Sequence, residues 1–415
     1  MPSAGSYSVT RRCAALAAAA AAIVLIAPPA RVQAQSEVRA LWVVRTSLNS
    51  PAAVSAMVDA ASATGFNTLL VQIRGRGDAY YANGLDPRPA SLASQPAFDP
   101  LAATITRAHA AGLQVHAWIN VNLVAGASEL PAARDHIIYR HPEWLMVPRA
   151  LSDDLNGVDP RSPQYLGRLA RYVRGQAAEV EGLYLSPISA ASADYTVGVV
   201  RDIVTRYAVD GVHLDYVRYP NDDFDYSHDS VTAFRTSIVA NLSAADVRKY
   251  DARLRAEPLV YTAAFPERWR AFRAGRMTAL MTRLAATIRT AKPATTISAA
   301  VAPDAGDAFA HRLQDWKTWL DQGLVDVICP MAYTTDVGVF ASQIAAAREI
   351  AGQRLVWAGI GAYRLSSEQI VENVQSARRL GASGTVLFSY DSLTSPSHGP
   401  DYLASIARAA FLVDQ

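Results

Sequence analysis

The sequence predicts an α/β protein folded as a single (β/α)8 barrel of the TIM type, with helical insertions after the third and fourth strands. Eight short runs rich in Val, Ile, Leu and aromatic residues recur along the 415-residue chain. None alternates cleanly between apolar and polar residues, as expected of parallel strands buried on both faces. The last four runs begin at positions 296, 325, 354 and 384. Spacings of 29, 29 and 30 residues fit one strand and one helix per unit.

The eight expected strands are Arg39–Arg45, Asn67–Arg74, Gln114–Asn120, Gly211–Tyr219, Thr296–Asp304, Val325–Tyr333, Arg354–Tyr363 and Gly384–Asp391. Helical patterns with start and stop signals fill the gaps. Asp99 and Pro100 suit an N-cap and a first-turn proline, and Gly112 suits the end of that helix. Ser366 and Gln369 form a capping-box pattern before another helix.

An open, doubly wound sheet is the alternative fold. Such a sheet normally carries a glycine-rich phosphate turn after its first strand. The segment Val43–Ser47 contains no glycine, and Arg74–Gly77 has too few glycines at the wrong spacing. The closed barrel is therefore favoured.

Two of the gaps between strands are long. Residues 121–210 hold extra helices and an extra apolar run, Leu183–Ile188, and residues 221–295 hold at least two helices. Both segments follow the C-terminal ends of strands, where barrel enzymes build their sites. We expect residues 35–415 to form one domain in which residues 221–295 cap the barrel mouth.

The N-terminus has the pattern of a secretory signal peptide, residues 1–34. Arg11 and Arg12 precede an apolar run, Ala14–Ala27, and Val32–Ala34 is a small-x-Ala cleavage pattern. The run is shorter than the roughly 20 residues that span a bilayer. We expect export to the periplasm or the extracellular space, with weak features of the twin-arginine route. An uncleaved anchor and a misassigned start codon are the alternatives.

The charge balance excludes a basic surface for nucleic acid. Lys and Arg number 39 against 37 Asp and Glu, a formal charge of +2. Cleavage after Ala34 removes three arginines and leaves 36 basic against 37 acidic residues, a charge of −1. Nucleic-acid-binding domains are usually strongly basic. The remaining apolar runs are too short to span a membrane, so we expect no stable transmembrane segment after cleavage.

No cofactor or metal site is expected. Cys13 lies within the signal peptide, so Cys329 is the one cysteine of the mature chain and reads as an inert core thiol. The acidic segment Asn221–Asp225 lacks EF-hand spacing and is interpreted as a solvated turn rather than a calcium loop. His136 and His141 are five residues apart rather than the four of a helical metal pair.

The segment Asp210–Pro220 carries the strongest candidate for catalysis. Strand alternation places His213, Asp215, Val217 and Tyr219 on one face, so Asp215 would point into the barrel near its mouth. A buried carboxylate needs partners. Arg218, Arg74 and His116 are the candidates. We interpret Asp215 as a catalytic carboxylate; the alternative is a structural ion pair or strand-end cap.

Several segments together resemble the glycosyl hydrolase-like 10 family of exported bacterial proteins. They are Gln72–Ala79, His116–Asn120, Asp215–Pro220, Pro330–Tyr333 and Phe388–Tyr390. The similarity covers roughly residues 37–395. It implies a TIM-type barrel, glycoside hydrolysis and action on the glycan strands of peptidoglycan. From the family's Asp-Tyr-x-Arg-Tyr-Pro run, a catalytic role is carried over to Asp215 alone.

The same strand also resembles the chitinase-type motif Asp-Gly-x-Asp-x-Asp-x-Glu. Asp210, Gly211 and Asp215 match the motif, but His213 stands at the position of its second aspartate and Val217 at that of the catalytic glutamate. This departure argues against the chitinase acid machinery.

Glycoside hydrolysis usually requires a second carboxylate. Asp304 and Asp336 follow the fifth and sixth strands and are the leading candidates for it. Asp391, after the eighth strand, and Glu267, in the second insertion, are weaker candidates, and a helix cap or turn is the favoured interpretation of Asp391.

Arginines and aromatic rings at strand ends are candidates for substrate binding. Arg74, Arg76 and Asp78 suit sugar hydroxyls or a muramyl carboxylate; an ion-pair network closing the barrel mouth is the alternative. Aromatic rings stack on sugar faces, although many belong to the core. The remaining candidates are His116, Trp118, Asn120, His213, Arg218, Tyr219, Tyr333, Trp357 and Tyr390. Further aromatic residues near strand ends are Trp42, Tyr80, Tyr81 and Tyr363.

The sequence thus favours an exported glycoside hydrolase that acts on a polysaccharide, most simply peptidoglycan glycan. A non-catalytic carbohydrate-binding barrel of the cell envelope is the alternative. A binding module needs stacking aromatics but no paired acids, so a second carboxylate at the mouth separates the two.

Overall fold

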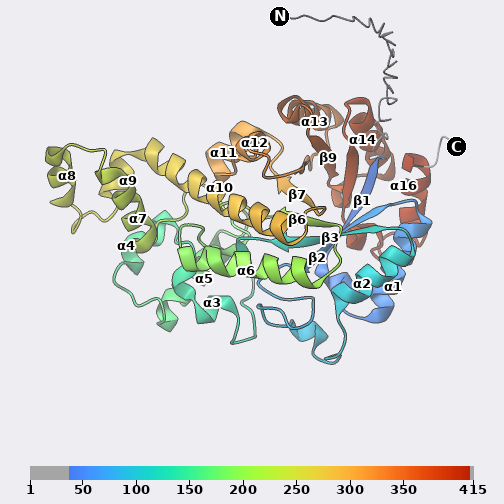
Figure 1. Ribbon diagram of the computed structural model, residues 1–415, viewed down its shortest axis with the longest axis horizontal. Helices are drawn as coiled ribbons and strands as arrows, with labels where there is room; N and C mark the ends of the chain where they lie inside the picture. The colour runs from blue at the N-terminus through green and yellow to red at the C-terminus, as the bar shows by residue number, and fades with distance from the viewer. Residues whose placement is uncertain (1–36, 412–415) are drawn as a thin grey trace, which may run out of the picture. The chain divides into compact units, whose positions relative to one another are not determined.

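Eight parallel strands close into a barrel in the computed structural model, which describes residues 37–411 (Figure 1). The predicted signal peptide lies outside the described residues. The strands are β1 (Val38–Val43), β2 (Thr68–Arg74), β3 (Gln114–Asn120), β6 (Gly211–Asp215), β7 (Thr296–Val301), β8 (Val327–Pro330), β9 (Leu355–Ile360) and β10 (Gly384–Phe388). Seven of them lie within the predicted runs, and β1 begins one residue before its run, at Val38. Because β1 pairs with both β2 and β10, the sheet has no open edge, and the doubly wound alternative is excluded.

Helices surround the barrel and follow most strands. They are α1 (Pro51–Ala63), α2 (Pro100–Ala110), α3 (Ile137–Arg140), α4 (Ser152–Leu155), α5 (Pro163–Gly175), α6 (Ala190–Arg206), α7 (His228–Val239), α8 (Ala244–Asp251), α9 (Val260–Ala264), α10 (Pro266–Ala291), α11 (Ala305–Arg312), α12 (Trp316–Asp321), α13 (Val337–Ala351), α14 (Ser367–Arg379), α15 (Tyr390–Leu393) and α16 (Tyr402–Phe411). Asp99 caps α2 and Ser366 forms a capping box on α14, as the sequence predicted. No helix within residues 37–411 is both long and apolar enough to cross a membrane.

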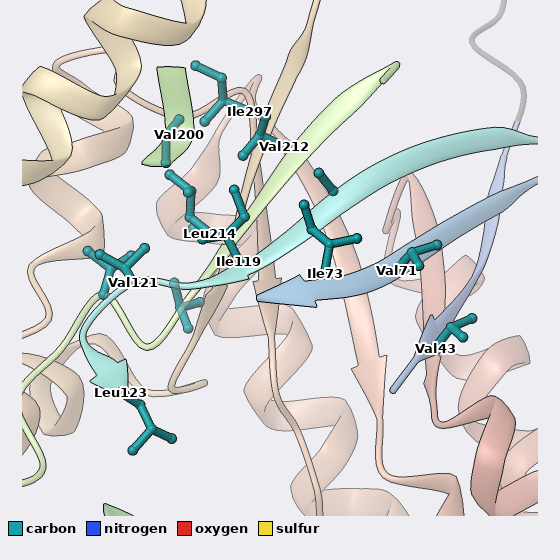
Figure 2. Close-up of a cluster of buried hydrophobic side chains, with 14 of the residues drawn as sticks. Val43, Val71, Ile73, Ile119, Val121, Leu123, Val200, Val212, Leu214 and Ile297 are labelled. Atoms are coloured by element: carbon teal, nitrogen blue, oxygen red, sulfur yellow. The ribbon is translucent and has the colours of Figure 1, made fainter. Parts of the chain in front are cut away.

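The main core lies between the strands and the surrounding helices. Figure 2 shows Val212 and Leu214 of β6 in one apolar cluster with Val200 of α6. A smaller cluster, which includes Trp42 and Trp118, fills the barrel itself. Adjacent strand residues contribute to different clusters because side chains alternate across a strand. On β1, for example, Leu41 belongs to the outer core and Trp42 to the inner one.

The insertion after β3 contains a small second sheet. Strand β4 (Leu123–Gly126) pairs antiparallel with β5 (Gly182–Tyr184), at the start of the predicted apolar run. The insertion after β6 has two parts. The C-terminal half of α10 packs into the main core, whereas α7, α9 and the start of α10 share a separate cluster around Phe234, Tyr261 and Trp269.

Candidate active site

A pocket of about 200 Å³ lies at the C-terminal ends of the barrel strands. It is lined by Trp42, Val44, Arg45, Gln72, Arg76, Trp118, Asp215, Tyr216, Arg218, Met331, Tyr333 and Phe388. We call it the mouth pocket. Catalytic residues of barrel enzymes come from these strand ends. Its lining combines one carboxylate, three arginines and several aromatic rings.

Asp215 is the last residue of β6, and its side chain is only 5% exposed. Its Oδ2 accepts a hydrogen bond from Nε1 of Trp118 at 3.2 Å, and its Oδ1 accepts one from the backbone N–H of Tyr216 at 2.6 Å. Burial raises the pKa of Asp215 to about 6, although the Arg218 guanidinium and these two donors act in the opposite direction. A carboxyl group with this pKa exchanges its proton near neutral pH.

The backbone turns sharply after Asp215 and ends the strand alternation. Tyr216 has a φ of 53°, in the left-handed region that non-glycine residues rarely adopt. Tyr216 and Arg218 therefore line the pocket, whereas Val217 lies in the main core. Tyr219 is buried, and its hydroxyl donates to the backbone carbonyl of Arg273 at 3.3 Å. The expectation that Val217 and Tyr219 share the face of Asp215 is wrong for this reason.

A bulge in β2 turns Arg74 away from the pocket. The pairing of β2 with β3 shifts between Gln72 and Arg74, so Gln72 lines the pocket and Arg74 does not. The Arg74 guanidinium is fully buried, with Nε 2.5 Å from Oδ2 of Asp86. Its Nη1 also donates to the carbonyl of Asn120 at 2.6 Å. Arg74 therefore has a structural role, the alternative that the sequence left open.

The predicted partners of Asp215 in catalysis lie outside the pocket. Asp304 and Asp336 are exposed N-caps of α11 and α13, and each accepts a backbone N–H from the third residue of its helix. Glu267 is exposed and pairs with Arg270. Asp391, in α15, accepts from the backbone N–H of Val44, the residue after β1, at 2.9 Å. Asp215 is thus the single acid in the lining formed by residues 37–411.

Two of the three pocket arginines are neutralised by acids behind them. Nε of Arg45 lies 3.1 Å from Oδ2 of Asp78, and Nη2 of Arg218 lies 2.9 Å from Oε1 of Glu181. Asp78 also accepts the backbone N–H groups of Gly75 and Arg76, so it shapes the turn after β2 and is not part of the lining. Arg76 makes no ion pair within the described residues and contacts the ring of Tyr216.

Several predicted substrate-binding residues lie inside the barrel, beneath the pocket. His116, His213 and Trp357 are at most 3% exposed and do not line it. Asn120 is level with Asp215 at the end of β3, but it is fully buried and does not line the pocket either. These side chains contact other groups of the protein: the Asn120 amide donates to the carbonyl of Gly75, and the His116 ring packs on Trp357. Tyr390, the first residue of α15, is also absent from the lining. Alternation assigned the inner face correctly but not the depth along the barrel.

His213 supports the wall of the pocket from below. Its Nε2 lies 3.0 Å from Nε1 of Trp42, and its Nδ1 lies 2.9 Å from Oγ of Ser298. Trp42 donates its N–H, so His213 accepts at Nε2 and Nδ1 carries the proton. Burial, with the nearby His116, lowers the pKa of His213 to about 3. The imidazole is therefore neutral at physiological pH.

The pocket also includes residues absent from the predicted set. They are Val44, Arg45, Gln72, Tyr216, Met331 and Phe388, whereas Trp42 was among the predicted strand-end aromatics. Alternation along β1 places Trp42 and Val44 on one face, and this signal was available in the sequence. The position of Tyr216 could not be predicted from alternation, since it depends on the left-handed turn.

The described residues contain no group of three or more His, Cys, Asp and Glu arranged to hold a metal ion. The acidic segment after β6 is not a solvated turn throughout, because Asp225 is fully buried. Its Oδ1 accepts the backbone N–H groups of Val147 and Ser227, and its Oδ2 accepts from the Ser230 hydroxyl. This carboxylate fixes the loop that precedes α7.

No residue of the insertion 221–295 lines the mouth pocket. The insertion belongs to the same compact unit as the barrel, residues 37–415. A cap over the mouth stays a prediction.

The closed parallel barrel, with a buried carboxylate among arginines and aromatic rings at its mouth, defines a TIM-barrel protein with an enzyme-type pocket. The chain belongs to the glycosyl hydrolase-like 10 family, whose profile matches residues 37–374.

Two relatives share part of this region with the chain. The chain is 25% identical over 209 residues to glycosyl hydrolase YngK of Bacillus subtilis, a match that covers 46% of this chain and 35% of that protein. It is 24% identical over 300 residues to glycosyl hydrolase DigH of Escherichia coli K12, covering 65% of this chain and 55% of DigH. The matches therefore span about half or less of each relative.

Solved structures share the barrel fold. The glycoside hydrolase domain of PgaB (BpsB) from Bordetella bronchiseptica superposes with a TM-score of 0.62 at 14% identity, covering 90% of this chain and 99% of that domain. The catalytic domain of a β-amylase from Paenibacillus polymyxa gives a TM-score of 0.59 at 11% identity, with coverages of 91% and 98%. At these identities the likeness concerns the fold alone.

Proposed function

We propose that this chain is an exported glycoside hydrolase that cleaves the O-glycosidic bonds of peptidoglycan glycan strands. The observation that carries the proposal is Asp215, a nearly buried carboxyl group with a pKa of about 6 at the barrel mouth. Membership of the glycosyl hydrolase-like 10 family supports the reaction class. The aromatic rings of Trp118, Tyr216 and Tyr333 around this carboxyl suit sugar faces.

Asp215 acts as the general acid. Glycosidases keep the proton on their acid near neutral pH by shielding the carboxyl group from water, and burial likewise raises the pKa of Asp215. The N–H groups of Trp118 and Tyr216 fix the orientation of the carboxyl. In this role, Asp215 protonates the oxygen that leaves with the departing sugar.

The second catalytic group comes from the substrate. Two-carboxylate mechanisms place the acids about 5–5.5 Å or about 6.5–9.5 Å apart. The pocket lining formed by residues 37–411 contains Asp215 as its only acid. Some glycosidases instead use a group of the substrate itself. The acetamido oxygen of an N-acetylated sugar is such a group, and both sugars of peptidoglycan carry it.

Arg76 is the candidate for recognising the acidic sugar. It lines the pocket and makes no ion pair within the described residues, unlike Arg45 and Arg218. A guanidinium binds a carboxylate through two parallel hydrogen bonds. The lactyl carboxylate of a muramyl residue without its peptide offers that partner.

A non-catalytic carbohydrate-binding barrel is the second candidate function. The observation that favours it is the same single carboxylate, since binding requires rings and arginines but no pair of acids. The two functions differ in whether new reducing ends appear.

The test measures reducing ends released from purified, peptide-free peptidoglycan strands. Asp215→Asn should lower release by about 10²–10⁴-fold if Asp215 transfers the proton. Asp304→Asn is the matched control: it is the same substitution at an exposed N-cap, where asparagine caps as well as aspartate. Its release should equal that of the wild type.

Near-normal release by Asp215→Asn, with a normal thermal melt, would remove this residue from the mechanism. Binding of the strands by the wild type without any release would favour the binding barrel.

A further inference from the structure

A second cavity, of about 840 Å³, lies between the α4–α5 segment and helices α7 to α9. These helices gather on one side of the barrel (Figure 1). The cavity shares no lining residue with the mouth pocket. Its volume is within the range of about 300–1,000 Å³ typical of ligand sites. Nothing in the proposed reaction uses it.

The cavity walls are apolar but carry two hydroxyl groups. Leu155, Val231 and Leu254 contribute aliphatic surface. Tyr165 and Tyr226 are 5% and 7% exposed, yet their phenolic oxygens have no hydrogen-bond partner in the described chain. Neither oxygen is among the buried atoms that lack a partner, so each keeps some exposure to solvent, and both residues line the cavity. The hydroxyl of the third tyrosine, Tyr261, already donates to Asp251.

The rim of the cavity is polar and carries more acid than base. Four acids line it, Glu143, Asp159, Asp229 and Asp251, against the two arginines Arg235 and Arg255. Arg235 is held by Asp251 in a two-pronged ion pair. Asp159, Asp229 and Arg255 make no ion pair within residues 37–411. The excess of carboxylates disfavours phosphates and other anionic ligands, because like charges repel.

We infer that this cavity is a second saccharide-binding site, which holds an uncharged N-acetylhexosamine segment of a polysaccharide. Such a segment presents apolar ring faces and acetamido methyl groups to the aliphatic and aromatic walls. Its hydroxyl groups meet the free Tyr165 and Tyr226 hydroxyls and the unpaired rim side chains. The choice of sugar rests on the proposed function; the existence of the site rests on the cavity itself.

The test is calorimetric titration of the Asp215→Asn chain with the hexamer of β-1,4-linked N-acetylglucosamine. This variant retains both pockets while removing hydrolysis. Two binding events are expected, one in each pocket. Tyr165→Phe/Tyr226→Phe, which removes both hydroxyls and keeps the rings, should weaken one event about 10-fold, since each hydrogen bond contributes about 0.5–1.5 kcal/mol.

Leu254→Trp obstructs the cavity and should abolish the same event while leaving the other unchanged. Val339→Trp is the matched control, because Val339 is an apolar side chain that is 45% exposed on α13 and belongs to neither pocket. It should leave both events unchanged. Thermal melts identify any variant that fails to fold.

A single binding event that the cavity variants do not alter would overturn the inference and leave the proposed hydrolysis standing. Binding of an apolar dye or a peptide in the cavity, without binding of the hexamer, would also overturn it. If the titration shows binding in the cavity but none in the mouth pocket, the result would count against the proposed function and leave the cavity site standing.

Discussion

The indole N–H of Trp118 donates to Oδ2 of Asp215 across 3.2 Å, from one barrel strand to the next. The pairing of β3 with β6 places Asn120 opposite Asp215, so Trp118, two residues earlier, is on the same inner face. A neutral donor that bonds to a carboxylate stabilises its charged form. This bond therefore restrains the rise in the pKa of Asp215 that burial causes.

Replacement of Trp118 by Phe should raise the pKa of Asp215 further. The ring remains, but the carboxylate loses a donor, and a lost hydrogen bond to a charged group of about 1.4 kcal/mol corresponds to about one pKa unit. If Asp215 is the general acid, the decline of kcat/KM at high pH should move up by about one unit. A pH profile of glycan cleavage measures this. An unmoved limb in a folded variant would contradict the role of Trp118.

The raised pKa of Asp215 predicts a pH-dependent effect of Asp215→Asn on stability. Between about 3.8 and about 6 the folded state binds the proton more tightly than the unfolded state, so the wild type loses stability as pH rises through this window. Asparagine does not titrate. The difference in free energy of unfolding, variant minus wild type, should therefore rise by on the order of 3 kcal/mol from pH 3.5 to pH 8.

Urea unfolding of both proteins at the two pH values measures this difference. An amide in place of a carboxylate that accepts two hydrogen bonds also changes the unfolding free energy. That change is the same at both pH values, so it cancels in the comparison. An equal difference at both pH values would mean that Asp215 has an ordinary pKa.

His213→Leu should destabilise the protein at pH 7 and flatten its acid response. The variant leaves the buried N–H of Trp42 without an acceptor, which costs about 1–3 kcal/mol. The folded-state pKa of His213, about 3, lies below the ordinary value of 6.5. Wild-type stability from this group is therefore present above pH 6.5 and lost as pH falls towards 3.

In the wild type, His213 adds about 1.4 kcal/mol per pH unit to the dependence of the unfolding free energy on pH, and the variant should lack this contribution. Unfolding free energies at pH 7 and pH 5 test it. A slope identical to that of the wild type would show that His213 is not buried in its neutral form.

Arg76→Ala should weaken the use of an acidic glycan selectively. The variant removes the pocket arginine that has no ion pair within the described chain. A lost charge-assisted contact of about 1.5–3 kcal/mol corresponds to about a 10- to 100-fold rise in KM for peptide-free peptidoglycan. The control substrate is the uncharged N-acetylglucosamine hexamer, whose KM should stay within about twofold. Equal effects on both substrates would contradict recognition of a carboxylate by Arg76.

The order and number of the strands were determined by the sequence itself. Each barrel strand is an apolar run bounded by turn residues, and the even spacing of the last four allows one helix between neighbours. The C-terminal ends of the strands then meet at one rim, whatever the details of packing. For this reason Asp215, Trp118 and Tyr333, each predicted from its strand end, line one pocket.

The tertiary structure decided which neighbouring side chains reach that pocket. The bulge in β2 sends Arg74 outward to Asp86, and the left-handed turn at Tyr216 sends Tyr219 into the core. A rule of strict alternation contains neither irregularity. His213 has the predicted face but lies below the pocket, because depth depends on how the strands are staggered around the barrel. The local sequence therefore determines where each strand lies and which face most of its side chains occupy. The closure of the barrel determines which of those side chains meet at the mouth.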